Sequence, residues 1–156
     1  MIIDTHAHIL PQATLEAMSA KASEFPSVKL IREDDKFQLA FNGGKPTRPI
    51  MPKLRLFEPR RQFMAGTGVD LQLPGGWLDS FGYEIPAEEG ADWSRFLNEG
   101  MLAECRDKDG LVPLATVPLQ DGKLAAQVLR EAVKAGMPGA MIGTQNKGTH
   151  GNLDDP

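Results

Sequence analysis

Short apolar segments alternate with stretches of helical periodicity along this chain, and this alternation constrains the fold more than any other feature. Strands are expected at residues 2–10, 69–73, 111–117 and 139–143. Helices are expected at residues 12–25, 56–65, 92–108 and 121–135, the last capped by Asp121 and ended by Gly136. Such alternation predicts an α/β fold, with a parallel sheet covered by helices. A closed (β/α)₈ TIM-type barrel needs about 250 residues, so the sequence corresponds to about half of one.

A smaller unit interrupts this alternation. Residues 28–31 and 37–41 are apolar, the charged residues 32–36 lie between them, and Asn42-Gly43-Gly44 follows. The pattern predicts a short antiparallel β-hairpin. Because it lies between the first and second expected strands, we expect an insertion that is not part of the barrel core.

The first expected strand, IIDTHAHIL at residues 2–10, carries two of the three histidines. Alternate side chains of a strand share a face, so Asp4, His6 and His8 should point one way and the residues between them the other. Two neutral imidazoles at this spacing can converge on one divalent ion, and Zn²⁺ accepts nitrogen and carboxylate ligands together. The alternative is a histidine pair that only hydrogen-bonds inside a small core.

Composition excludes several classes of protein. The chain has 156 residues, 41% hydrophobic and 24% charged, which is typical of one globular domain. Its net charge of −4 argues against a general affinity for nucleic acid or anionic membranes. The single cysteine, Cys105, excludes an internal disulfide and is interpreted as structural. The sequence contains neither a stretch of membrane-spanning length nor a signal peptide, so we expect a cytoplasmic protein.

Three motifs carry a resemblance to a known family. They are IIDTHAHILP at residues 2–11, FEPRRQFMAGTGVDLQL at 57–73, and GLVPLATVPLQDGKLAAQVLREAVKAGMPGAMIGT at 110–144, followed by NLDDP at 152–156. With them the chain resembles the amidohydrolase superfamily, and most closely its aminocarboxymuconate semialdehyde decarboxylase branch. The third motif is the most specific, because it matches a continuous strand, loop, helix and strand.

The resemblance implies a (β/α)₈ barrel with a divalent metal, usually Zn²⁺, at its C-terminal mouth. His6 and His8 match the first two metal ligands of the family. A third histidine ligand, a catalytic histidine and an aspartate come from later strands in family members, and no such segments occur in this sequence. We therefore expect residues 1–156 to be a truncated domain, the N-terminal half of the barrel in a longer enzyme or in a shortened reading frame, with its catalytic residues beyond residue 156.

Arg48 matches an arginine that holds a substrate carboxylate in the decarboxylase branch. A planar guanidinium suits this role, because it can donate two charge-assisted hydrogen bonds to one carboxylate. The alternative is a solvated loop arginine.

Other residues have weaker claims to a site. His150 could be a third metal ligand, but a glycine-flanked loop holds a ligand poorly, so we expect it to be exposed. Asp4 could orient His6 instead of binding metal directly. Arg60 and Arg61 are interpreted as a solvated helix face. Trp77 and Phe81 could form an aromatic wall over the substrate, or could simply pack.

These features predict a metal-dependent decarboxylase acting on an unsaturated or aromatic carboxylic acid. One alternative is a metal-dependent hydrolase or hydratase of a related lactone, amide or acid. Another is a catalytically inactive half-barrel module that pairs with another chain. The expected partners are a small-molecule carboxylate substrate and, when full length, a second copy in a homodimer. The 156-residue chain alone is expected to be inactive, because catalytic zinc normally has three protein ligands.

Overall fold

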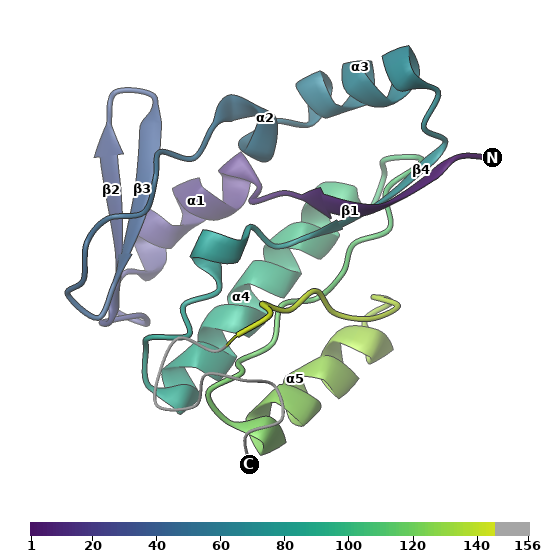
Figure 1. The fold of residues 1–156 in the computed structure, drawn as a ribbon. Helices are drawn as coiled ribbons and strands as arrows, with labels where there is room; N and C mark the ends of the chain where they lie inside the picture. Colours follow the sequence, from purple (N-terminus) through teal and green to yellow (C-terminus); the bar gives the residue numbers. More distant parts are fainter. Residues whose placement is uncertain (146–156) are drawn as a thin grey trace.

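A parallel arrangement of strands lies at the centre of the molecule, in a computed structural model that describes residues 1–145. β1 (Ile3–His8) pairs in parallel with β4 (Leu71–Gly75), and the two run side by side in Figure 1. The parallel order continues through single bridges, from Gln72 to Leu111 and from Ala115 to Ala140. The predicted parallel order is therefore confirmed. The third and fourth segments form bridges and not full strands, and Pro113 removes one backbone donor from the third.

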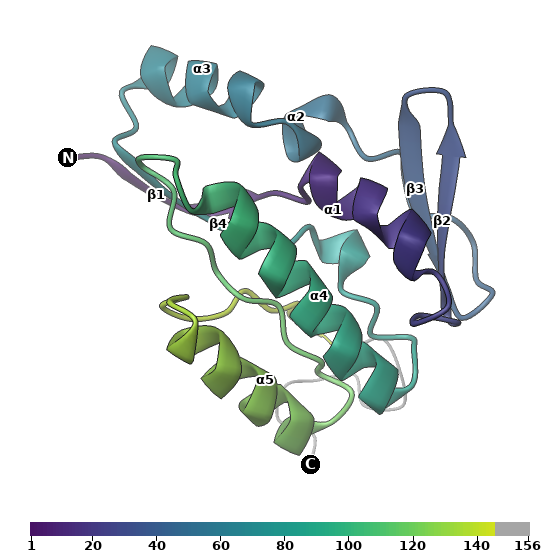
Figure 2. The ribbon, with the colours of Figure 1, turned by 180° about the vertical axis from the view of Figure 1, so that it is seen from behind.

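Helices connect these segments. They are α1 (Gln12–Met18), the short α2 (Pro52–Arg55), α3 (Phe57–Thr67), α4 (Ala87–Cys105) and α5 (Gly122–Lys134), with 3₁₀ turns at Ser19–Lys21 and Leu78–Ser80. Figures 1 and 2 show α4 and α5 side by side. The helix expected at residues 12–25 is shorter than predicted. Its α-helical part ends at Met18, and a 3₁₀ turn at Ser19–Lys21 follows.

The start and end of α5 follow the prediction. The Asp121 side chain accepts hydrogen bonds from the backbone N–H groups of Lys123 and Leu124, both at 2.9 Å. These bonds satisfy two of the backbone donors that a helix leaves unpaired at its start. After the last turn Gly136 adopts φ +108°, which costs a glycine little.

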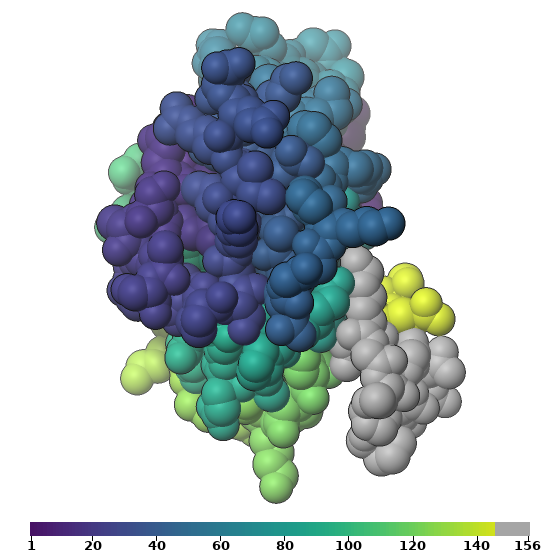
Figure 3. All heavy atoms as spheres, turned by 90° about the vertical axis from the view of Figure 1, so that its left-hand side faces the viewer, coloured from purple at the N-terminus to yellow at the C-terminus, as the bar shows by residue number. Residues whose placement is uncertain are grey.

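The predicted hairpin is confirmed as an antiparallel pair. β2 (Val28–Glu33) and β3 (Lys36–Phe41) are joined by a two-residue turn, in which Asp34 adopts φ +53°. Within the described residues the hairpin forms its own two-stranded sheet. Together with the segment around α1 it forms the upper part of the face seen in Figure 3, above the teal and green atoms of the later segments.

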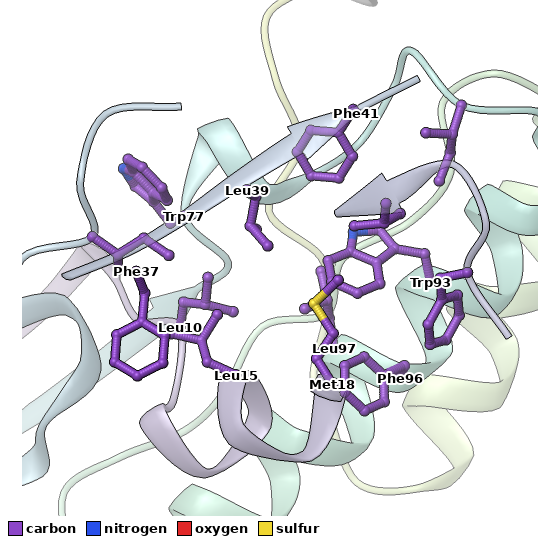
Figure 4. Packing of buried hydrophobic residues seen from close by; sticks show 14 residues of the cluster. Leu10, Leu15, Met18, Phe37, Leu39, Phe41, Trp77, Trp93, Phe96 and Leu97 are labelled. Atoms are coloured by element: carbon purple, nitrogen blue, oxygen red, sulfur yellow. The ribbon is translucent and has the colours of Figure 1, made fainter. Parts of the chain in front are cut away.

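The hairpin nevertheless contributes to the main hydrophobic core. Phe37, Leu39 and Phe41 point from β3 into a cluster with α1 and α4, where Trp93 is 1% exposed (Figure 4). Trp93 packs edge-on against Phe25, with ring centroids 5.3 Å apart. The insertion therefore stays outside the parallel sheet but is part of the hydrophobic interior.

A second cluster packs at the parallel segments. It comprises Ile9, Met64, Met101, Cys105, Leu111, Ala115, Ala132 and Met137. Cys105 is buried there, as the sequence predicts for a structural cysteine. Burial raises the pKa of its thiol to about 11, so the thiol is not activated as a nucleophile.

Close packing of α1 against α4 depends on Gly100. A Cβ atom built at Gly100 would overlap the Oγ1 atom of Thr14 and lie 2.9 Å from its Cγ2. We expect Gly100→Ala to lower the free energy of unfolding by about 1–3 kcal/mol, because overpacking outweighs the gain in helix propensity. Urea unfolding followed by circular dichroism measures this change. Gly66→Ala is the control, since a Cβ there meets nothing within 4 Å, and an equal loss in both variants would contradict the packing explanation.

Candidate metal-binding site

The two strand histidines lie together at the end of β1. Their ring centroids are 5.0 Å apart and the rings are nearly perpendicular, at 86°. The Nδ1 atom of His8 lies 2.9 Å from the carbonyl oxygen of Gly76. A carbonyl only accepts hydrogen bonds, so the neutral His8 ring carries its proton on Nδ1 and leaves the Nε2 lone pair free. The structure thus brings the predicted pair together and gives His8 the tautomer that a metal ligand needs.

The pairing of β1 with β4 is irregular at the first histidine. Asp4 pairs with Gln72, but the next partners are Ala7 with Pro74 and His8 with Gly75, so β1 has one extra residue in this stretch. Side-chain alternation is therefore shifted, and the pairing places Asp4 on the opposite face of the sheet from His8. The prediction that strict alternation puts Asp4 on the histidine face is wrong, because it assumed an unbroken strand.

Asp4 still contacts the first histidine, through the backbone. Its Oδ1 atom accepts from the His6 N–H at 3.1 Å and its Oδ2 atom accepts from Gln72 Nε2 at 2.7 Å. The bond from Gln72 and then the bond from His6 hold the pKa of the Asp4 carboxyl below its usual value. Asp4 therefore holds the main chain at His6 and has no hydrogen bond to the ring among the described contacts.

A pocket of about 360 Å³ opens beside His6. Its wall comes from the loop after β4 and from the fourth parallel segment, and includes Asp79, Phe81, Tyr83 and Met141. Loops at the carboxyl ends of parallel strands are the usual place for binding sites in α/β proteins. The pocket therefore gives a small molecule access to the exposed first histidine.

Tyr83 closes one side of this pocket. Its hydroxyl oxygen accepts a hydrogen bond from the Gly143 N–H at 3.2 Å, which ties the loop after β4 to the fourth segment. Burial raises the pKa of the Tyr83 phenol to about 12, only partly offset by that bond. At neutral pH the phenol is therefore uncharged.

This raised pKa predicts a loss of stability in alkali. Above pH 10 the unfolded chain ionises its tyrosine while the folded chain does not, so the contribution of Tyr83 to stability is constant below about pH 10 and falls toward pH 12. Tyr83→Phe removes this dependence, so the urea midpoint of wild type should fall relative to that of Tyr83→Phe as the pH rises through this range. Cys105→Ala is a control for the buried thiol, whose own window begins near pH 9. A constant difference between wild type and Tyr83→Phe would contradict the prediction.

Arg48 lies at the rim of the pocket. Its Nε and Nη2 atoms both lie 3.1 Å from Oδ2 of Asp79, which lines the pocket. The Arg48 side chain is 78% exposed, and its guanidinium carbon lies 5.8 Å from the centre of the Trp77 ring. The arginine is thus placed next to the site, with a carboxylate of the chain itself as its partner.

The two aromatic candidates differ in position. Trp77 is buried in the main core and packs there, as the simpler interpretation predicts. Phe81 lines the pocket but is only 2% exposed. An aromatic wall made by both residues is therefore not observed.

Arg60 corrects the prediction of a solvated helix face. It is 8% exposed, and its guanidinium donates to Gln72 Oε1 and to the carbonyl oxygen of His8. Its neighbour Arg61 is exposed and pairs with Glu58, as expected. The signal that sequence reasoning missed is the spacing of Arg60 with Met64, which puts both on the buried stripe of α3.

A complete set of metal ligands is not present in the described part of the chain. Within residues 1–145 no group of three His, Cys, Asp or Glu side chains is arranged to hold a metal. His150, the other candidate ligand, lies outside the described residues. In the same range, no helix is both long and apolar enough to cross a membrane.

Known proteins are similar to this chain in sequence and in fold. No family model matches the chain. Among curated proteins, 2-amino-3-carboxymuconate-6-semialdehyde decarboxylase from Caenorhabditis elegans is 29% identical over 132 residues, which are 84% of this chain and 33% of that protein. The chain therefore spans about a third of the length of this curated relative.

Solved structures of decarboxylases share the fold of this chain over part of their length. 5-Carboxyvanillate decarboxylase from Sphingomonas paucimobilis matches with a TM-score of 0.65 and 20% identity, over 94% of this chain and 43% of that one. Dihydroxybenzoic acid decarboxylase from Polaromonas sp. JS666, solved with manganese and 2-nitroresorcinol, matches with a TM-score of 0.63 and 17% identity, over 97% of this chain and 41% of that one. Together with the sequence motifs, these relatives support the resemblance of the chain to the amidohydrolase superfamily and its aminocarboxymuconate semialdehyde decarboxylase-like branch, over part of the length of those proteins.

Proposed function

We propose that this chain supplies the first two metal ligands of a divalent-metal-dependent decarboxylase whose substrate is an unsaturated or aromatic carboxylic acid. The observation that carries the proposal is the His6–His8 pair, with its rings 5.0 Å apart beside an open pocket. The three relatives described above are named as decarboxylases, which supports the reaction class. We propose in addition that residues 1–156 form the N-terminal half of a (β/α)₈ barrel, which the parallel order of four segments supports.

His6 and His8 suit a divalent metal, because each can offer a ring nitrogen as a ligand. His8 offers Nε2, because Gly76 holds the proton on Nδ1, and His6 is exposed at the pocket. Such a metal would polarise a substrate oxygen or lower the pKa of a bound water. We propose Zn²⁺, and manganese in one structural relative supports a divalent ion in general. Since two histidines fall short of the three protein ligands of catalytic zinc, we propose that the chain alone is inactive.

Arg48 is proposed to bind the substrate carboxylate. In the free protein its guanidinium is held by Asp79 at the pocket rim. A bound carboxylate could take the second edge of the guanidinium or displace Asp79, because one planar guanidinium has five donors in a fixed geometry. We also propose that the complete enzyme is a cytoplasmic homodimer, to be checked by fractionation of the source cells and by light scattering of the natural product.

Metal binding is tested by calorimetric titration of the chain with Zn²⁺ and Mn²⁺. We expect one ion per chain, and a loss of affinity of at least about 100-fold in His6→Ala and in His8→Ala, more than is usual for an outer hydrogen-bond partner. His150→Ala is the matched control and should bind as wild type does. Equal affinity in all four proteins would overturn the proposed site, and a loss in His150→Ala would assign a third ligand.

The reaction is tested on the natural gene product loaded with metal. Release of CO₂ from a panel of conjugated and aromatic acids is the expected result, with Arg48→Met raising KM more than it lowers kcat. Hydrolysis of lactones or amides without CO₂ release would favour the hydrolase alternative. No turnover of any substrate by the metal-loaded product would favour the inactive half-barrel module.

A further inference from the structure

The pairing of β1 with β4 is irregular around His6, one of the two proposed metal ligands. β1 pairs with β4 at Asp4 and again at Ala7, and Thr5 and His6 lie in the irregular stretch between. A bulge of this kind locally disrupts the ladder hydrogen bonds that normally define strand position. The His6 N–H is instead taken by the Asp4 carboxylate at 3.1 Å.

Buried side chains connect that carboxylate to the second histidine. Asp4 accepts from Gln72 Nε2 at 2.7 Å, Gln72 Oε1 accepts from Arg60, and Arg60 also donates to the His8 carbonyl oxygen. Gln72 is 2% exposed and Arg60 is 8% exposed, so neither exchanges its partners freely with bulk water. The path therefore runs without a break from the backbone of one histidine to the backbone of the other.

The Asp4 carboxylate and the Arg60 guanidinium, at the two ends of this path, fix which way the Gln72 amide between them is turned. A carboxylate only accepts hydrogen bonds and a guanidinium only donates them. The amide of Gln72 must therefore turn its N–H₂ to Asp4 and its oxygen to Arg60, as observed. An amide placed between these two groups is oriented by both of them.

We propose that Arg60, Gln72 and Asp4 form a brace that sets the position of the two histidine backbones, and thereby the separation of the imidazoles. Arg60 and Gln72 are positioning residues, because they reach the rings only through the main chain. This inference rests on the proposed function, in that the separation matters for binding a metal. It adds that the separation of the two imidazoles depends on residues of α3 and β4 as well as on β1.

A purely structural role for the buried arginine makes different predictions. Arg60 could simply attach α3 to the sheet, and its loss would then lower stability without changing the imidazoles. Burying a guanidinium is costly, and an apolar side chain of similar length often stabilises such a position equally well. A brace requires every donor along the path to face an acceptor, whereas simple attachment of α3 does not.

The hydrogen bond between residues 4 and 72 can be reversed by exchanging the carboxylate and the amide, which leaves the net charge of the chain unchanged. Asp4→Asn faces an amide with an amide, so the bond to Gln72 or the bond to the His6 N–H is lost. Gln72→Glu faces a carboxylate with a carboxylate, so the bond to Asp4 is lost while the contact with Arg60 remains. In the double variant Asp4→Asn/Gln72→Glu the new amide donates to the new carboxylate, and both outer contacts are retained.

Two readouts are measured on the complete 156-residue chain. Two-bond ¹H–¹⁵N spectra of the metal-free protein report the tautomer of His8, and calorimetry reports the affinity for Zn²⁺. We expect each single variant to shift the histidine signals and to weaken Zn²⁺ binding by about 10–100-fold. The double variant should return both to within about threefold of wild type. Gln62→Glu is the matched control, since Gln62 is exposed on α3 and bonds only Glu58 among the described contacts.

Stability is followed separately by melting temperature, and Arg60→Met is included as the variant that removes the anchor at His8. Single variants that melt earlier but keep wild-type histidine spectra and Zn²⁺ affinity would overturn the brace. A folded double variant that stays as weak as the singles would do the same. If wild type itself binds no Zn²⁺, the proposed function fails, and the spectra of the metal-free proteins still decide the brace.

Discussion

Trp93→Ala is expected to lower the free energy of unfolding by about 3–5 kcal/mol, which is typical of truncating a fully buried tryptophan. The Trp93 ring packs against Phe25, Phe41 and Phe96, and its Nε1 donates to the Ser80 carbonyl oxygen at 2.8 Å. Truncation therefore leaves a cavity where the hairpin, α4 and the turn after β4 meet, and one buried acceptor without a partner. Because domains of this size are stable by only about 5–15 kcal/mol, this substitution would remove a large part of the total stability.

Urea unfolding followed by far-ultraviolet circular dichroism measures this loss without relying on tryptophan fluorescence. Phe63→Ala is the control, since Phe63 is 54% exposed on α3, and it should change stability by less than about 0.5 kcal/mol. A cost below about 1 kcal/mol for Trp93→Ala would show that the hairpin cluster contributes little to folding, contrary to its burial.

Asn98→Leu is the second substitution with a large expected effect. The Asn98 amide accepts from the Thr116 N–H at 2.7 Å and donates to the Thr116 carbonyl oxygen at 2.9 Å, and all of these groups are buried. Leucine has a similar size but leaves both backbone groups of Thr116 without a partner. Each such group costs about 1–3 kcal/mol, so for the two groups we expect a loss of about 2–6 kcal/mol in urea unfolding.

The same contact explains how an irregular segment keeps its place. Residues 111–117 form only bridges in the described structure. The Asn98 side chain therefore satisfies backbone groups of Thr116 that a neighbouring strand would satisfy in a regular sheet. Gln127→Leu is the control, because it replaces an exposed amide that bonds Glu131 on α5. Hydrogen exchange at Thr116 should rise in Asn98→Leu and stay unchanged in the control. Wild-type protection in both proteins would contradict this account.

Sequence reasoning was most accurate where the governing interactions are local. The cap at Asp121 and the stop at Gly136 follow from residues within one helical turn. The hairpin at residues 28–41 and the pairing of the His6 and His8 rings were also predicted correctly. It was less accurate for the helix expected at 12–25, whose α-helical part ends at Met18, and for the third and fourth strands, which form only bridges. In the third segment Pro113 lacks the backbone N–H that a ladder needs.

The features of the site also divide into those set by local sequence and those set by residues distant in the chain. The type and spacing of the two histidines are properties of six consecutive residues in β1, Ile3–His8, and the sequence alone determined that both would lie at one end of a parallel strand. The tautomer of His8 and the hydrogen bond from Arg60 to the His8 carbonyl depend on partners 68 and 52 positions away. The side-chain alternation that would have put Asp4 beside the histidines is broken by a bulge, which forms only when β1 meets β4. Only the tertiary structure decided these features, because hydrogen-bond partners distant in the chain leave no periodic signal in the sequence.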